Sequence, residues 1–271
     1  MFGYDEYLVA DNENGHYRND GKNPCIRDPA YLQYQNQRYL EMVSEQREQN
    51  QESDDEDFVL DLWDYVVLND QTLVPAIPDS RAYSERVLKS VYAPYLEKIN
   101  ARPVLLMTHA YSYESSVQFD DVYDVVWHDI PSFTSALYQG YHSYVQVLSK
   151  LLPKEQAPLF APAGLAYLLI WEENRSMWER LFFTDGFHPT PHGTFLYGCV
   201  LYATIYNKMP ANIPKDVGDL WTRARKMQIG KGNQMPIPTQ DEAIYLAKVA
   251  ERVVLKKHLP KSFILDFEVD A

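Results

Sequence analysis

One short segment brings together an acid, a base and turn-forming residues: Thr184-Asp185-Gly186-Phe187-His188-Pro189. A three-residue separation in a turn lets the Asp185 carboxylate reach Nδ1 of His188. The acid then fixes the ring tautomer and stabilises the imidazolium, which leaves Nε2 free as a general base. The glycine, the prolines and the helix start that follows favour this interpretation. The alternative is a helix-entry turn in which Asp185 caps backbone amides and His188 is an ordinary surface residue.

A second polar cluster, Asn69-Asp70-Gln71-Thr72, follows a short apolar run at residues 65–68. The side-chain amide of Asn69 or Gln71 could donate a hydrogen bond to a developing oxyanion. One such donor typically contributes about 3 kcal/mol of transition-state stabilisation. The alternative is an Asx-type turn that satisfies local backbone amides.

His188 and His192 are four residues apart with Asp185 nearby, which suggests a metal site as an alternative. Pro189 and Pro191 disfavour one continuous helical face across both histidines, and no Glu follows in the H-E-x-x-H manner. Cysteines give no support either, because the two in the chain are far apart and outside any C-x-x-C pattern. We therefore expect no metal ligands.

The elements that must position these clusters alternate along the chain. Continuous apolar runs bounded by polar residues predict strands buried on both faces at 65–68, 103–108 and 157–162. Helical spacing predicts helices at 80–100 and 136–152. Such alternation implies βαβ units and an open parallel sheet with helices on both faces. Function in such sheets collects at the carboxyl ends of the strands, where both polar clusters are expected.

Two further helices have recognisable starts. Thr190 can cap a helix with Pro191 at its first position, and that helix, through residue 206, looks nearly buried all round. The pattern Thr239-x-x-Glu242 is a capping box that opens a last helix running to about His258. Between them, residues 208–238 form a long, locally basic insert.

The polar N-terminal segment, residues 1–57, differs from the rest of the chain. It shows little periodicity, although residues 30–46 could form a helix, and residues 45–57 carry seven acidic side chains against one Arg. A solvated loop accounts for that acidic stretch. Residues 58–271 are expected to form the α/β domain.

Charge and hydropathy exclude several classes of partner. The 271 residues carry a net charge of −13, which repels a nucleic-acid backbone and an anionic membrane surface. The chain contains no apolar run of 18 residues, so no transmembrane helix is expected. The first residues lack the basic and apolar regions of a signal peptide.

The chain resembles the SGNH/GDSL hydrolases through two of these segments. Residues 184–189 resemble the last block of that superfamily, where D-x-x-H supplies the acid and base of a Ser-His-Asp triad. Residues 63–72, WDYVVLNDQT, resemble the strand that carries the G-x-N-D block, and are similar to a subgroup reading W-D-Y-V-V-L-Q-x-Q-S. The segment at residues 161–166 and the closing helix at 243–254 also fit that subgroup. The resemblance covers about residues 58–258.

The resemblance implies a fold and roles for the residues. The fold is α/β, a three-layer flavodoxin-like sandwich with a parallel sheet. Asp185 is then the triad acid and His188 the base. Asn69 is the oxyanion donor, with Gln71 as the alternative because the subgroup varies here. Leu68 stands where the general block has glycine.

The nucleophile block of the superfamily is the main departure. No G-[DN]-S occurs in the chain, and the first serine, Ser44, follows no buried strand. Two explanations compete: an N-terminally truncated enzyme whose first strand is missing, or a degenerate relative. The retained acid and base favour truncation. A missing central strand would leave unpaired backbone edges that invite pairing with another chain, so the oligomeric state stays open.

The resulting expectation is a serine ester hydrolase that needs no cofactor and acts on a small polar ester, such as an acylated carbohydrate. As written, it would be weakly active or inactive. The rival expectation is a non-catalytic binding module derived from such an enzyme. The chain as written would be cytoplasmic, but secreted if an upstream leader has been lost.

Overall fold

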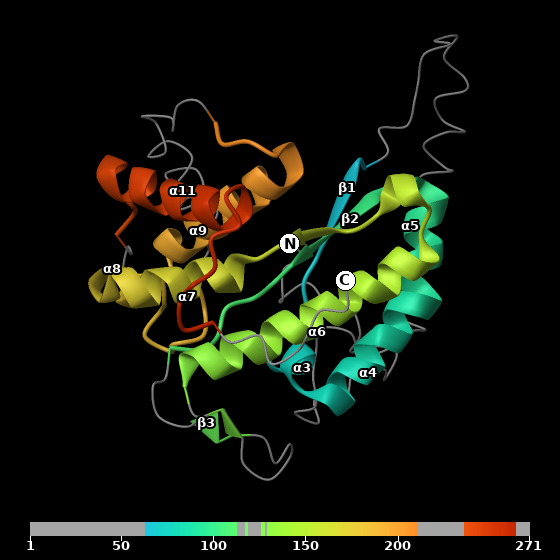
Figure 1. The fold of residues 1–271 in the computed structure, drawn as a ribbon, viewed down its shortest axis with the longest axis horizontal. Coiled ribbons are helices and arrows are strands. Elements are labelled where there is room, and N and C mark those ends of the chain that lie inside the picture. The colour runs from blue at the N-terminus through green and yellow to red at the C-terminus, as the bar shows by residue number, and fades with distance from the viewer. Residues whose placement is uncertain (1–62, 113–116, 119–125, 128, 211–235, 264–271) are drawn as a thin grey trace, which may run out of the picture.

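The computed structural model of this chain is an α/β structure built on a small open parallel sheet (Figure 1). The structure describes residues 63–112, 117–118, 126–127, 129–210 and 236–263. The sheet has the order β1-β2-β5, formed by β1 (Tyr65–Leu68), β2 (Arg102–Leu106) and β5 (Leu159–Ala161). The three predicted strands are confirmed, with ends that differ by up to two residues. The N-terminal segment 1–57 and residues 211–235 of the expected insert lie outside the described residues.

The parallel register brings the carboxyl ends of the strands to one edge of the sheet. Leu68 of β1 lies opposite Leu105 of β2, and Leu106 lies opposite Ala161 of β5. The central strand β2 is the most buried. In β1, by contrast, Val67 is 43% exposed, although its sequence predicts burial on both faces. Val67 is exposed because β1 lies at the edge of the described sheet. Within the part of the chain that the structure describes, β2 is the one strand paired with it.

The predicted helix 80–100 is divided into three pieces: α4 (Pro78–Val87), a π-helical turn η1 (Leu88–Tyr92) and α5 (Ala93–Ile99). Pro94 has no N–H to donate to the preceding turn, and the chain widens before it, with Ala93 N–H bonded to the carbonyl of Leu88. Asn100 ends α5 with a left-handed conformation, φ 54°. A short helix, α3 (Leu73–Ala76), precedes these pieces and follows the first polar cluster.

Helix α6 (Ile130–Leu151) begins six residues before the predicted start at 136. The missed signal is a capping box, in which Asp129 accepts from the Ser132 N–H and the Ser132 hydroxyl accepts from Asp129. Gly140 allows α6 to approach α3 closely, because a Cβ at this position would lie 2.0 Å from the carbonyl oxygen of Pro75. This approach brings Tyr141 and Tyr144 against the end of β1.

The remaining helices lie together on the left of Figure 1: α7 (Ala163–Glu173), α8 (Arg175–Glu179), α9 (Pro191–Tyr206) and α11 (Gln240–Val254). The Thr190 cap and the Thr239–Glu242 capping box are confirmed, although α11 ends four residues before the predicted end at His258. Helix α9 is not buried all round, because Tyr206 on its outer side is 58% exposed. The shorter elements are β3 (Val117–Gln118), β4 (Val126–Trp127) and η2 (Lys154–Gln156). Among the described helices, none is long and apolar enough to span a membrane.

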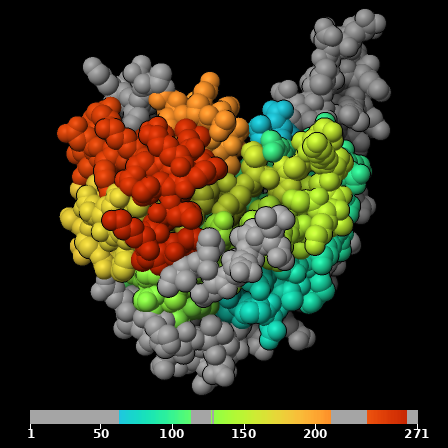
Figure 2. All heavy atoms as spheres, viewed as in Figure 1, coloured from blue at the N-terminus to red at the C-terminus, as the bar shows by residue number. Residues whose placement is uncertain are grey.

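Figure 2 shows the surface hollowed between the C-terminal helices, coloured orange and red, and β1, coloured blue. At the amino ends of β1 and β2, an open depression of about 380 Å³ is lined by Asp64, Asn100 and Arg102, among others. Both polar clusters follow the opposite, carboxyl ends of the strands. The depression is therefore separate from the candidate site.

Candidate active site

The turn that carries Asp185 and His188 is closed by backbone hydrogen bonds before any side chain is considered. Phe182 and Pro189 form an isolated antiparallel bridge, and the Phe183 N–H donates to the carbonyl of His188 at 2.9 Å. Gly186, with φ 71°, takes a conformation that side chains rarely adopt. The turn leads directly into the cap of α9 at Thr190, whose hydroxyl accepts from Gly193 N–H. Local sequence thus fixes the separation of the acid and the base.

The Asp185 carboxylate engages the histidine with one oxygen and the backbone with the other. Oδ2 lies 2.7 Å from Nδ1 of His188, and Oδ1 accepts from the N–H groups of Phe187 and His188 at 2.8 and 3.0 Å. Burial works to raise the pKa of Asp185, but the hydrogen bonds from the His188 ring and the two amides outweigh it, so the pKa lies below its ordinary value. The group is therefore a carboxylate at neutral pH. Asp185 therefore does both things that the sequence analysis gave as alternatives: it accepts from backbone amides, and it binds the ring of His188.

A carboxylate can only accept, so Nδ1 of His188 carries the hydrogen of this bond. In the neutral ring, Nε2 then has a free lone pair, which is the form required of a general base. The His188 side chain is 75% exposed, and that of Asp185 is 42% exposed. The His188 ring is therefore open to solvent. Within the described residues, no serine hydroxyl is hydrogen-bonded to His188.

The two oxyanion candidates at the end of β1 differ in their availability. Gln71 uses both ends of its amide: Nε2 donates to the Tyr111 hydroxyl at 3.0 Å, and Oε1 accepts from Leu73 N–H at 2.8 Å. Asn69 is exposed, and its side chain has no hydrogen-bond partner among the described residues. Asn69 is the amide that is free to donate, and Gln71 supports the start of α3.

Tyr111 joins the end of β1 to the turn formed by residues 185–188. Its hydroxyl binds Gln71, and its ring meets the Phe187 ring edge-on, with centroids 4.5 Å apart. Next to it, Ser112 N–H donates to the carbonyl of Gly186 at 3.0 Å. The structure thus places Gln71 and the 185–188 turn at the same edge of the sheet. The sequence analysis did not single out Tyr111. It lies in the polar stretch that follows the second buried strand, and that position could have indicated it.

His109 is a second histidine at this edge that sequence reasoning missed. It lies just beyond β2, is 4% exposed, and stacks on Tyr167 with centroids 4.3 Å apart. Its Nε2 lies 2.9 Å from the carbonyl oxygen of Phe187, and its Nδ1 lies 2.6 Å from the Tyr197 hydroxyl. Burial lowers the pKa of His109 to about 4, against the opposing effect of the Phe187 carbonyl. The ring is neutral at physiological pH.

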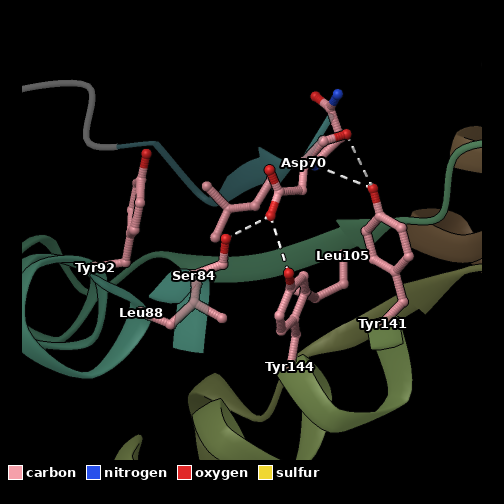
Figure 3. A pocket seen from close by; sticks show the side chains of 9 residues that line it. Asp70, Ser84, Leu88, Tyr92, Leu105, Tyr141 and Tyr144 are labelled. Atoms are coloured by element: carbon pink, nitrogen blue, oxygen red, sulfur yellow. Dashed lines mark hydrogen bonds between the residues drawn. The ribbon is translucent and has the colours of Figure 1, made fainter. Parts of the chain in front are cut away.

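Asp70 is buried between the two oxyanion candidates and organises the end of β1 (Figure 3). Its Oδ2 accepts from the hydroxyls of Ser84 and Tyr144 at 2.7 and 2.9 Å, and its Oδ1 accepts from Gln71 N–H. Burial raises the pKa of Asp70 to about 6, although these hydrogen bonds lower it. The adjoining cavity is about 30 Å³, far below the several hundred Å³ of a substrate pocket. Asp70 therefore holds the backbone and does not face a substrate.

His192 does not join His188 in a metal site. It is buried, and its Nε2 lies 3.2 Å from Oε2 of Glu242, which also pairs with Arg180. Burial lowers the pKa of His192, against the effect of Glu242. This cluster joins α9 to α11. Among the described residues, no group of three or more histidine, cysteine or acidic side chains could hold a metal ion.

Comparison with known proteins gives little that bears on function. No family model matches the chain, and no curated protein sequence matches it. One solved structure, a DUF4886 family protein from Bacteroides uniformis, is similar to it with a TM-score of 0.43 and 13% sequence identity. The match covers 72% of this chain, and this chain spans 63% of the length of that structure.

Proposed function

We propose that this chain is an ester hydrolase of the SGNH type in which His188 is the general base and Asp185 is its acid partner. The observation that carries the proposal is the 2.7 Å contact between Oδ2 of Asp185 and Nδ1 of His188, with Nε2 left open. The three described parallel strands belong, in this proposal, to a three-layer flavodoxin-like sandwich. No cofactor takes part.

The chemistry assigned to the dyad is proton transfer. Nε2 of His188 removes a proton from an attacking hydroxyl or water, and the resulting imidazolium is stabilised by the Asp185 carboxylate. The oxygen nucleophile bonds to the ester carbonyl carbon, and the carbonyl oxygen becomes an oxyanion. When the intermediate collapses, the C–O bond to the alcohol breaks and His188 returns the proton to the alcohol. With water as nucleophile, the products are one acid and one alcohol; with a hydroxyl as nucleophile, the acyl group stays on that oxygen until a second attack, by water, releases the acid and restores the hydroxyl.

The oxyanion donor in this proposal is Asn69, with Gln71 as the alternative. Support for Asn69 comes from its exposed, unengaged amide at the carboxyl end of β1. The amide of Gln71 is already hydrogen-bonded to Tyr111 and Leu73. A role for Gln71 as the oxyanion donor therefore requires that one of these hydrogen bonds be exchanged. The proposed substrate is a small polar ester such as an acylated carbohydrate, in keeping with the open surface around His188.

The test is a panel of p-nitrophenyl esters together with acetylated sugars, assayed with the chain as written. We expect slow hydrolysis, close to that of free imidazole at the same concentration, because His188 then assists only water. His188→Ala should remove the part of the hydrolysis rate that depends on the protein. His142 is a half-buried histidine on α6, so His142→Ala is the matched control and should leave that rate unchanged. A serine-directed organophosphonate should leave the protein unlabelled. Rapid turnover with covalent serine labelling would instead identify a nucleophile in the chain.

A non-catalytic binding module is the second candidate. It is favoured by the fact that, within the described part of the chain, no serine hydroxyl is bonded to His188, while Phe183 and Phe187 beside the turn are each 37% exposed. Exposed rings can stack on sugars. Calorimetric titration with acylated and free sugars separates the two: binding with no His188-dependent hydrolysis would favour the module and contradict the enzyme.

A further inference from the structure

The peptide bond between Phe187 and His188 is held by hydrogen bonds on both of its polar sides. Its carbonyl oxygen lies 2.9 Å from Nε2 of His109, and its N–H donates to Oδ1 of Asp185 at 3.0 Å. Because the peptide is planar, it cannot rotate without breaking one of these bonds. The segment after β2 and the turn before α9 therefore meet at the residue pair that presents the base.

The hydrogen bonds around His109 have one consistent arrangement. A carbonyl oxygen only accepts, so Nε2 carries the ring hydrogen and donates it to Phe187. The ring is neutral, so Nδ1 has a lone pair that accepts the Tyr197 hydroxyl hydrogen at 2.6 Å. The Tyr197 oxygen in turn accepts from His109 N–H at 3.1 Å. Every polar hydrogen of the group has one acceptor, which leaves the ring no alternative tautomer.

Aromatic packing also holds the His109 ring in place. The ring is stacked on Tyr167 at an interplanar angle of 8°, and the Phe182 ring meets it edge-on at 5.0 Å. Phe182 is also the residue whose bridge to Pro189 closes the turn. The donor thus belongs to the buried core, whereas Asp185 and His188 are exposed.

We propose that His109 is a positioning residue for the ester-hydrolysis site. It holds the Phe187 carbonyl so that the next N–H binds the Asp185 carboxylate, which then faces the His188 ring in the productive orientation. The catalytic consequence rests on the proposed function; the geometric part does not. A hydrogen bond to the carbonyl also polarises the same peptide and strengthens its N–H as a donor.

The test compares two substitutions in one buried network. His109→Phe keeps a ring for the stack on Tyr167 but removes the donor to Phe187. Tyr197→Phe removes a hydroxyl from the same network but leaves the Nε2–H donor in place, so it is the matched control. The readouts are the pKa of the Asp185 carboxyl, followed by carbon NMR, and the chemical shift of the His188 amide proton.

In His109→Phe, we expect the depressed pKa of Asp185 to move up toward its ordinary value and the His188 amide resonance to move upfield. Tyr197→Phe should leave both close to wild type. Hydrolysis of p-nitrophenyl acetate should fall by no more than about twofold in His109→Phe alone, because the unaltered protein already works at a rate close to that of free imidazole. His109→Gln, which keeps an N–H donor within reach of the carbonyl, should restore part of both signals.

Equal effects of the two substitutions, or no effect of His109→Phe, would overturn the positioning role. If His109→Phe does not fold, nitrogen NMR of the unaltered protein decides: a hydrogen on Nδ1, or an Nε2–H that exchanges freely with water, overturns the proposal, and a protected Nε2–H upholds it. Absence of ester hydrolysis in the unaltered protein would refute the proposed function while leaving the NMR comparison intact. The two failures are therefore distinguishable.

Discussion

The hydroxyl oxygen of Tyr144, on α6, lies 2.9 Å from Oδ2 of Asp70, at the end of β1. The neighbouring Tyr141 hydroxyl accepts the Asp70 N–H at 3.0 Å, so one helix holds both the side chain and the backbone of this residue. Because Asp70 stands between Asn69 and Gln71, this link fixes the rim of the candidate site from inside the protein. It also makes the stability of the fold depend on a buried carboxyl group.

The contribution of Asp70 to stability should fall as the pH rises from about 4 to about 6. Its pKa is raised from 3.8 to about 6 in the folded protein, so between these values the folded state holds a proton that the unfolded state has lost. The loss should reach at most about 3 kcal/mol and then level off. Urea unfolding of the protein and of Asp70→Asn across this pH range measures it. The same slope in both proteins would assign the effect to other groups.

Tyr144→Phe should destabilise the protein by about 1–2 kcal/mol at pH 8 and by less at pH 4. The hydroxyl donates to the ionised form of Asp70, so its loss matters most where Asp70 is ionised. Chemical unfolding at the two pH values measures the difference. Tyr202→Phe, on the partly exposed face of α9, is the control with a similar change of side chain. A pH-independent loss in Tyr144→Phe would mean that packing, not the hydrogen bond, is responsible.

Gly140→Ala should destabilise the protein by about 1–3 kcal/mol, because the new methyl group would overlap the Pro75 carbonyl and separate α6 from α3. Gly198→Ala provides the matched control on α9. A Cβ there meets nothing within 4 Å, and alanine favours a helix, so a gain of about 0.5–1 kcal/mol is expected. Thermal unfolding of both variants measures the contrast. An unchanged melting temperature in Gly140→Ala would show that the α3–α6 contact adjusts freely.

Glu242→Gln should destabilise the protein at pH 7, and the difference from wild type should shrink as the pH falls from about 4.5 toward 2. Burial works to raise the pKa of Glu242, but the Thr239 amide, His192 and Arg180 hold it at about 2. A carboxyl with a lowered folded-state pKa stabilises above its unfolded value and loses this as it is protonated. The glutamine oxygen can still accept from the Thr239 N–H, but its NH2 group cannot accept from Arg180, so the variant removes the charge together with one accepted hydrogen bond. A difference that stays constant down to pH 2 would exclude the ionic contribution.

Asp185→Asn should lower the His188-dependent ester hydrolysis at every pH between 5 and 9, by about twofold to threefold, because the amide no longer fixes the tautomer or stabilises the imidazolium of His188 and the unaltered pair works little faster than free imidazole. The pKa of Asp185 lies below its ordinary value, so its own protonation should not shape the rate profile in this range. Initial rates with p-nitrophenyl acetate across the range measure both points. Glu155→Gln, on the exposed surface near the amino ends of the strands, is the control. Equal rates in Asp185→Asn and the unaltered protein would remove Asp185 from the mechanism.

Features that depend only on neighbouring residues could be predicted before the fold was known. The 2.7 Å contact of Asp185 with His188, the Thr190 cap and the Thr239–Glu242 capping box are set within three or four residues, so spacing alone predicts them. The strands at 65–68, 103–108 and 157–162 could also be predicted from the sequence, since strands of a parallel sheet are typically continuous apolar runs. The start of α6 at Ile130 could also be predicted, because Asp129 and Ser132 form a capping box and Ile130, Phe133 and Leu137 fall at helical spacing; the expected start at 136 was too late.

The distant residues that support the site are brought to it by the packing of separate segments. His109 and Phe187 are 78 positions apart, and Asp70 and Tyr144 are 74 apart; their contacts arise because parallel strands end at one edge and Gly140 lets α6 approach α3. The same packing engaged Gln71 with Tyr111 and left Asn69 free, a choice that sequence left open. A side chain's burial and partners depend on what other segments bring to it. Local spacing therefore predicts the acid–base pair, whereas the groups that align it depend on the whole fold.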